Sequence, residues 1–354
     1  MPNFALTGVR LAGFSTAVPS DLSEVRPTAT VSVVDLAKIT TSTGVKVRHI
    51  APAGVCSSDL CFAAAERLLQ RIGWDRSSVD LLIFITQTPD YVLPATACSL
   101  HGRLGLVKSC AAFDVNLGCS GYVYGLSIAA GHIQTGAARR ALLLVGDTIS
   151  KVISEEDRSV AFLFGDAGSA TALESSTGVA SMHFVTGSDG SGARHLQIQA
   201  GMFREPSNEQ TRFVRARQGG ISRSDEHLHM NGPEIFNFTI REVPSMIGAV
   251  MQSANWSAIQ VDGFVLHQAN RFMLEYLIKR MKLPPEKVVM ALENYGNTSS
   301  ASIPLAICAS LRERLLDTPT RLVLAGFGVG FSWAAAAVEL DCPHVEPVIF
   351  VPAP

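Results

Sequence analysis

The segment AFDVNLGCSGY, residues 112–122, begins as an apolar run and ends in small residues that favour a helix, with Gly118 at the turn between them. A second segment, VVMALENYGNT at residues 288–298, has the same plan and carries Asn297 where the first carries Cys119. Each plan predicts a buried strand, a sharp bend that glycine permits, and then a helix. The chain is therefore expected to contain two related units.

Two further pairs of segments support an internal repeat. VDLLIF at 79–84 resembles VDGFVL at 261–266, and ALLLVG at 141–146 resembles RLVLAG at 321–326, so three segments recur in the same order. Apolar runs that alternate with helical patterns indicate parallel strands, buried on both faces and joined by right-handed crossovers. We predict two packed α/β halves, residues 1–175 and 176–354. Chance similarity among α/β segments is the alternative, and the shared order disfavours it.

The composition indicates a large buried core and disfavours two classes of partner. Of the 354 residues, 47% are hydrophobic and 17% are charged, and the formal net charge is -2. Because there is no basic excess, we expect no nucleic-acid partner and no attraction to an anionic membrane. The first residues lack a signal-peptide pattern, and no apolar run reaches the ~20 residues of a membrane span, so we expect a cytoplasmic protein. The seven irregularly spaced cysteines argue against a disulfide framework.

Cys119 is the cysteine best placed for chemistry. It stands where an apolar run gives way to a helical pattern, and free N–H groups at a helix start favour the nucleophilic thiolate. From this segment alone, an inert buried thiol remains the alternative.

Three other elements are expected to converge on Cys119. His267 ends an apolar run in LHQAN, residues 266–270, at the strand end where ligands of α/β sheets collect, although a lone histidine is more often structural. Asn297 takes the place of Cys119 in the second repeat, so pseudo-twofold symmetry would bring both to one cleft. The glycine-rich run FGVGFS, residues 327–332, would supply a backbone donor that forms an oxyanion hole with the N–H of Cys119.

With these residues in view, the chain resembles the β-ketoacyl-acyl-carrier-protein synthase III family of the thiolase superfamily. The resemblance covers nearly the whole chain and implies a thiolase-like fold, a five-layered αβαβα sandwich of two pseudo-duplicated halves. It is carried by GCSGY at 118–122, HQAN at 267–270, GNTSSAS at 296–302, FGVGF at 327–331, TGVKVRH at 43–49 and FGDAG at 164–168.

The resemblance implies a decarboxylative condensing acyltransferase with a triad of Cys119, His267 and Asn297. Cys119 would take an acyl group from a thioester primer. His267 and Asn297 would then hold the thioester carbonyl of a malonyl-type extender on acyl carrier protein while it loses carbon dioxide. No metal and no permanently bound cofactor is expected; the substrates are thioesters of coenzyme A or of the carrier's phosphopantetheine. A homodimer is expected by analogy.

Further site residues are expected from the same resemblance. Phe327 would lie beside the departing carboxylate, and Val329, flanked by Gly328 and Gly330, would provide an oxyanion donor. The remaining assignments are Arg158, Asn270 and Gly232 for the thioester and phosphopantetheine arm, and Arg271, Lys279 and Arg280 for docking an acidic carrier protein. An ordinary solvated helix face is the alternative for these last three.

Two departures from the family pattern bear on the primer. LAKITTS at 36–42 lacks the tryptophan that stacks on the adenine of coenzyme A in family members, although Arg158 matches the arginine on the adenine's other side. Leu93 stands where the family often has phenylalanine, at a position that a dimer partner contributes to the acyl pocket. Both departures favour a carrier-bound or bulkier primer and a specialised acyl or polyketide pathway over housekeeping fatty-acid synthesis.

Other functions remain open at this point. The same triad could pass the acyl group to an amine, an alcohol or a β-keto acid, and only substrate trials discriminate. A non-catalytic binder of acyl carrier protein would be expected to lack one of the three residues, and a hydrolase would need a water-accessible acyl-enzyme. The segment 201–225, with five arginines, is predicted to be a surface excursion.

Overall fold

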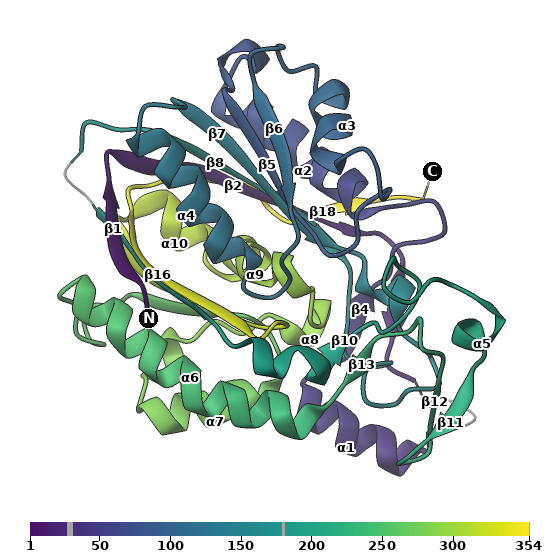
Figure 1. Ribbon diagram of the computed structural model, residues 1–354. Coiled ribbons are helices and arrows are strands. Elements are labelled where there is room, and N and C mark those ends of the chain that lie inside the picture. Colours follow the sequence, from purple (N-terminus) through teal and green to yellow (C-terminus); the bar gives the residue numbers. More distant parts are fainter. Residues whose placement is uncertain (27–30, 179–180, 354) are drawn as a thin grey trace.

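The computed structural model describes residues 1–26, 31–178 and 181–353, which form two large β-sheets with helices between and outside them, and three two-stranded sheets (Figure 1). Helices α4 and α9 each contact strands of both sheets and form the middle layer. Helices α2 and α3 cover the outer face of one sheet, and α6 covers the outer face of the other with α7 packed beside it. The layers therefore run α, β, α, β, α, as expected for a thiolase-like sandwich.

The first sheet has the order β17-β2-β8-β7-β5-β6, with β18 also paired to β2. Strand β5 is parallel to both β6 and β7, whereas β8 is antiparallel to β7 and to β2. Its interior strands are almost fully buried because helices cover both faces. The bounds are β2 (Val9–Pro19), β5 (Leu81–Ile85), β6 (Ala111–Val115), β7 (Arg140–Asp147), β8 (Ala167–Ser175), β17 (His344–Val345) and β18 (Ile349–Val351).

The second sheet has the order β1-β9-β16-β15-β14, in which β14 and β15 are parallel and the other pairs are antiparallel. The sheets exchange chain ends, because β1 joins the second sheet while β17 and β18 join the first. A division at residue 175 therefore follows the sheets except at the two ends of the chain. The bounds are β1 (Asn3–Thr7), β9 (Ser181–Ser188), β14 (Gly263–Leu266), β15 (Thr320–Gly328) and β16 (Ser332–Leu340).

The repeat is incomplete at residues 288–291, which match β6 in sequence. Here a single bridge joins Val288 to Phe264, and no strand continues from it. The side chain of Gln268 replaces the missing ladder: its amide nitrogen donates to the carbonyl of Val289, and its oxygen accepts from the N–H of Ala291. A side-chain amide thus satisfies backbone groups that a neighbouring strand would otherwise pair.

Two helices in the middle layer begin at the turns that carry Cys119 and Asn297. Glycine allows α4 to pack closely, because a Cβ at Gly125 would lie 2.7 Å from a methyl group of Leu143. No helix within the described residues is long and apolar enough to cross a membrane. The bounds are α1 (Val33–Thr43), α2 (Ser57–Ile72), α3 (Thr96–Arg103), α4 (Gly121–Gln134), α5 (Glu209–Arg212), α6 (Gly232–Ser253), α7 (Arg271–Met281), α8 (Leu292–Tyr295), α9 (Ser302–Ser310) and α10 (Arg312–Asp317).

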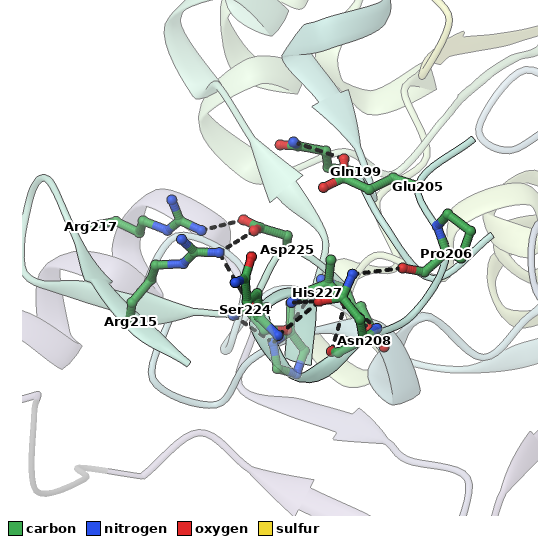
Figure 2. Close-up of polar contacts among 12 residues, drawn as sticks. Gln199, Glu205, Pro206, Asn208, Arg215, Arg217, Ser224, Asp225 and His227 are labelled. Carbon is green, nitrogen blue, oxygen red and sulfur yellow. Dashed lines mark hydrogen bonds and ion pairs between the residues drawn. The ribbon is translucent and has the colours of Figure 1, made fainter. Parts of the chain in front are cut away.

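The arginine-rich segment 201–225 projects beside the sandwich, as predicted for a surface excursion (Figure 1). Three of its five arginines form ion pairs. Arg215 and Arg217 both pair with Asp225 (Figure 2), and Arg223 lies 3.1 Å from the buried carboxylate of Asp157. The bounds of the remaining short strands are β3 (Leu22–Glu24), β4 (Val47–His49), β10 (Leu196–Gln197), β11 (Arg215–Arg217), β12 (Ile221–Arg223) and β13 (His229–Met230).

Candidate active site

Cys119, His267 and Asn297 line one cavity of ≈ 280 Å³ between the two halves. Cys119 lies two residues before the start of α4, His267 follows β14, and Asn297 follows α8. All three side chains are buried. The walls leading to them are mostly apolar and include Ile149, Val152, Leu163, Phe164, Leu196, Leu228, Met230, Ile235 and Met273.

Burial controls the charge state of the cysteine and the histidine. It raises the pKa of Cys119 to about 11, and a backbone hydrogen bond at Val329 acts in the opposite direction. Burial therefore outweighs the thiolate stabilisation expected at a helix start. The pKa of His267 falls to about 3 for the same reason. At neutral pH the cavity is thus lined by a protonated thiol and a neutral imidazole.

The ring of His267 is held by α9 and by an aromatic neighbour. Its Nδ1 lies 2.7 Å from the hydroxyl oxygen of Ser302, so Nε2 is the nitrogen left for chemistry. The ring meets Phe327 edge-on, with ring centroids 5.7 Å apart and an angle of 85° between the planes. These contacts fix the orientation of the imidazole without giving it a charged partner.

Asn297 is fixed through its backbone and its side chain. Its N–H donates to the carbonyl of Leu163, and its own carbonyl accepts from the N–H of Gly165. The side-chain oxygen accepts from the N–H of Ser299 at 2.9 Å, and Nδ2 donates to the carbonyl of Ala269 at 3.2 Å. The amide is therefore oriented with its nitrogen as the donor, and one N–H remains for a ligand.

The turn after β15 approaches the cysteine closely. Gly328 and Gly330 have φ angles of 159° and 138°, which side chains rarely adopt. A Cβ added at Gly328 would lie 2.8 Å from the sulfur of Cys119. Two glycines therefore allow the backbone of Val329 to reach the sulfur, as an oxyanion donor requires.

Comparisons with known proteins match this arrangement. Residues 113–190 match the family model 3-Oxoacyl-[acyl-carrier-protein (ACP)] synthase III, and residues 251–340 match the model of its C-terminal part. A β-ketoacyl-[acyl-carrier-protein] synthase III of Clostridium perfringens is 34% identical over 95% of this chain and 100% of its own length. A relative of the same name from Neisseria meningitidis serogroup B is 35% identical over 85% of this chain and 89% of its own.

This chain belongs to the β-ketoacyl-acyl-carrier-protein synthase III family. The crystal structure of a 3-oxoacyl-(acyl-carrier protein) synthase from Burkholderia xenovorans LB400 superposes with a TM-score of 0.92 at 43% identity, covering 99% of both chains. The priming β-ketosynthase of the R1128 polyketide pathway superposes with a TM-score of 0.78 at 25% identity, covering 96% of this chain and 98% of its own. The resemblance, the thiolase-like fold and the assignment to condensing acyltransferases are confirmed.

The synthase III residues expected around the triad fall into two groups. Asn270 and Gly232 line the cavity with Phe327, Gly328 and Val329, while Gly330 continues the same turn. Arg158 and Leu93 do not line it. Arg158 donates to the carbonyl of Gly219 in the arginine-rich segment, and the side chain of Leu93 is 82% exposed.

The three basic residues expected to dock a carrier protein do not form one cluster. Arg271 begins α7 beside the cavity and lies 3.5 Å from the carboxylate of Glu293. Lys279 and Arg280 occupy the last turn of α7, about 12 Å further along the helix axis. Only Arg271 therefore stands next to the cavity.

Sequence reasoning did not single out several residues that the structure brings to the cysteine. Gln87 follows β5 and lines the cavity with Asn116. Ser299, with a φ of 51°, has a side-chain hydrogen bond that lowers the pKa of Cys119. Gln87 stands at the carboxyl end of an apolar strand, so the strand-end rule that selected His267 could have selected it too.

Proposed function

We propose that this synthase III family member transfers an acyl group from a thioester primer to Cys119 and condenses it with a malonyl-type extender. The product is a β-ketoacyl thioester, with release of carbon dioxide. The observation that carries the proposal is the convergence of Cys119, His267, Asn297 and the Val329 turn on one apolar cavity.

In the loading step, neutral His267 accepts the proton of the Cys119 thiol. The sulfur attacks the primer carbonyl, and backbone N–H groups at Cys119 and Val329 stabilise the oxyanion. The bond to the donor sulfur breaks, and the departing thiol takes the proton from the imidazole. Burial lowers the pKa of His267, which keeps the resting ring neutral and favours return of the proton from the imidazole to the departing thiol.

In the condensing step, His267 acts as the Nε2–H tautomer, with Nδ1 accepting from the hydroxyl of Ser302. His267 and Asn297 then donate hydrogen bonds to the carbonyl oxygen of the extender thioester. Loss of carbon dioxide leaves an enolate whose charge these donors stabilise. The enolate carbon attacks the acyl-enzyme, the bond to Cys119 breaks, and the thiolate that leaves takes a proton from water. Phe327 forms an apolar wall, beside which a carboxylate is poorly solvated and neutral carbon dioxide is favoured.

The primer donor is proposed to be acyl carrier protein, with coenzyme A as the alternative donor. Residues 36–42 lack the stacking tryptophan and form part of α1, and Arg158 is engaged by the arginine-rich segment. The carrier's acidic surface would meet Arg271, and the phosphopantetheine arm would pass Asn270 and Gly232. No resident metal or cofactor is proposed.

A cytoplasmic homodimer is proposed for the working enzyme. Strand β6 has one strand neighbour within the described chain, because it ends the first sheet. Tyr91, Val92 and Leu93 are 67%, 59% and 82% exposed, an apolar stretch that a partner subunit would cover. Leu93 would then contribute to the partner's acyl pocket.

Intact-protein mass spectrometry tests the proposal. The enzyme is incubated with a panel of acyl-coenzyme A and acyl-carrier thioesters, beside Cys119→Ala. A mass increment that requires Cys119, followed by carbon dioxide release and a β-ketoacyl product when malonyl-carrier is added, is the expected result. Loading without carbon dioxide release, with the acyl group recovered on an added amine, alcohol or β-keto acid, would instead favour a different acyl acceptor.

A further inference from the structure

A fully buried carboxylate lies next to the catalytic cavity. Asp147 is the last residue of β7, and its side chain is inaccessible to solvent. One carboxylate oxygen accepts hydrogen bonds from the N–H of Gln87 at 2.7 Å and from the hydroxyl of Thr86 at 3.2 Å. The other accepts from the N–H and the hydroxyl of Ser300, at 3.2 and 2.6 Å.

The two carboxylate oxygens of Asp147 accept hydrogen bonds from opposite sides of the active site. Gln87 follows β5 in the first sheet, and its side chain packs on the cysteine turn, where a Cβ at Gly118 would lie 2.0 Å from its oxygen. Ser300 belongs to the turn that carries Asn297, in the second half of the chain. One carboxylate therefore links, through hydrogen bonds, the side of the cavity that carries Cys119 to the side that carries Asn297.

The hydrogen bonds between Ser300 and Asp147 influence the side-chain amide of Asn297 through one intervening residue, Ser299. The N–H of Ser299 holds the side-chain oxygen of Asn297 at 2.9 Å, which leaves the amide nitrogen as the donor. Ser299 has a φ of 51°, an unfavourable backbone conformation for a residue other than glycine. The fixed N–H and hydroxyl of Ser300 help to hold the turn in that conformation.

Removing this carboxylate from water is costly, which suggests a role beyond filling space. Burial raises the pKa of Asp147, and hydrogen bonds from Ser300 and Gln87 oppose the rise. These donors and the hydroxyl of Ser299 are neutral, so the carboxylate is held by hydrogen bonds of specific direction. A buried polar group satisfied in this way fixes the geometry of its neighbours.

We infer that Asp147 is a positioning residue for the condensing step, which fixes the turn at residues 297–300 so that the Asn297 amide faces the extender carbonyl. The inference rests on the proposed function. It distinguishes the two half-reactions, because loading requires Cys119 and the Val329 turn, whereas decarboxylation also requires the Asn297 amide.

The substitution Asp147→Asn is expected to affect the hydrogen bonds to Ser300 while it keeps those on the side of Gln87. Its side-chain oxygen can still accept from Gln87, but its amide group then faces the N–H of Ser300, donor against donor. The turn at 297–300 then loses the hydrogen bond from the N–H of Ser300, whereas the cysteine side keeps the hydrogen bond from Gln87. Loading of Cys119 is expected to stay near the wild-type rate, and carbon dioxide release from malonyl-carrier to fall about 100-fold, the scale expected for a misplaced catalytic group.

Glu346→Gln is the matched control. Glu346 is a buried acid that pairs with Arg67 and Arg71 and does not line the catalytic cavity. Its loss is expected to lower the melting temperature without separating loading from carbon dioxide release. Equal loss of both half-reactions in Asp147→Asn, or the same separation in Glu346→Gln, would overturn the inference.

Amide hydrogen exchange provides a readout that does not depend on turnover. Exchange at residues 298–300 is expected to accelerate in Asp147→Asn relative to both wild type and Glu346→Gln. Unchanged exchange there overturns the positioning role even if the wild-type enzyme is fully active. If the wild type itself neither loads an acyl group nor releases carbon dioxide, the proposed function fails, and the exchange measurement still decides whether Asp147 fixes the turn.

Discussion

The Nδ1 atom of His267 lies 2.7 Å from the hydroxyl oxygen of Ser302, the first residue of α9. This contact assigns Nε2 of the ring to the substrate and leaves the imidazole without a carboxylate partner. A neutral ring that donates one hydrogen bond suits stabilisation of an enolate, because the donor gains strength only as charge develops on the extender oxygen.

Ser302→Ala is expected to lower the rate of carbon dioxide release about tenfold, the scale of one orienting hydrogen bond. The ring would remain buried but lose its fixed orientation. Single-turnover kinetics with pre-acylated enzyme measure the effect. Ser310→Ala, at the exposed end of the same helix, is the control and should behave as wild type. An unaltered rate in Ser302→Ala would mean that packing against Phe327 alone orients the ring.

Gly328→Ala is expected to abolish most acyl loading, by about 100-fold or more, because the added methyl group displaces the sulfur from its oxyanion donors. The new Cβ would lie 2.8 Å from the sulfur of Cys119. Gly248→Ala is the matched control, since no atom outside the adjoining backbone of its own helix lies within 4 Å of a Cβ there. That change, inside α6, should leave loading intact and stabilise the fold by about 0.5–1 kcal/mol. Mass spectrometry and thermal unfolding report the two effects.

The sequence predicted the parts of the site that lie next to glycines and at strand ends. Cys119 follows Gly118 and Asn297 follows Gly296. The backbone conformation of each turn depends on the adjacent glycine, so the local sequence pattern is enough to find both turns. Asp147 also ends an apolar strand, yet its importance depends on the distance to Ser300, 153 positions further along the chain. Such pairings depend on the packing of the two halves, which periodicity does not specify.

The incomplete repeat has a similar cause. Residues 288–291 have the composition of a strand, and the side chain of Gln268 takes the hydrogen bonds that a strand ladder would supply. The direction of a glutamine side chain is a tertiary property. The charge state of Cys119 is another, because a helix start favours the thiolate, whereas the depth of burial, which raises its pKa to about 11, is known only once the cavity is built.

Acid is expected to destabilise the protein partly through His267. Its pKa is about 3 in the folded chain, against an ordinary value of 6.5, so only the unfolded chain takes up the proton between these values. The neutral ring stabilises the fold above pH 6.5, and this contribution is lost as the pH falls toward 3. Between pH 6.5 and 5 the loss is about 2 kcal/mol.

Urea unfolding at pH 7 and pH 5 measures this loss, with His267→Asn as the comparison. Other histidines contribute to the pH dependence of both proteins, because burial also lowers the pKa of His49 and His183. The difference between the two proteins therefore isolates His267. If both lose the same stability on going to pH 5, the folded ring is not held neutral.

Leu93→Phe is expected to shorten the longest primer that loads onto Cys119. The side chain is 82% exposed in the single chain and does not line its cavity, so an effect on primer length requires that a partner subunit use it. A larger ring at that position would fill the end of the partner's acyl pocket. Loading is measured across a series of acyl-carrier thioesters, with the mass of the assembly determined by light scattering. Ile259→Phe, at another side chain that is 83% exposed, is the control for adding an aromatic surface. A dimer whose chain-length profile is unchanged by Leu93→Phe would remove Leu93 from the acyl pocket, and a monomer that still loads long primers would remove the partner subunit as well.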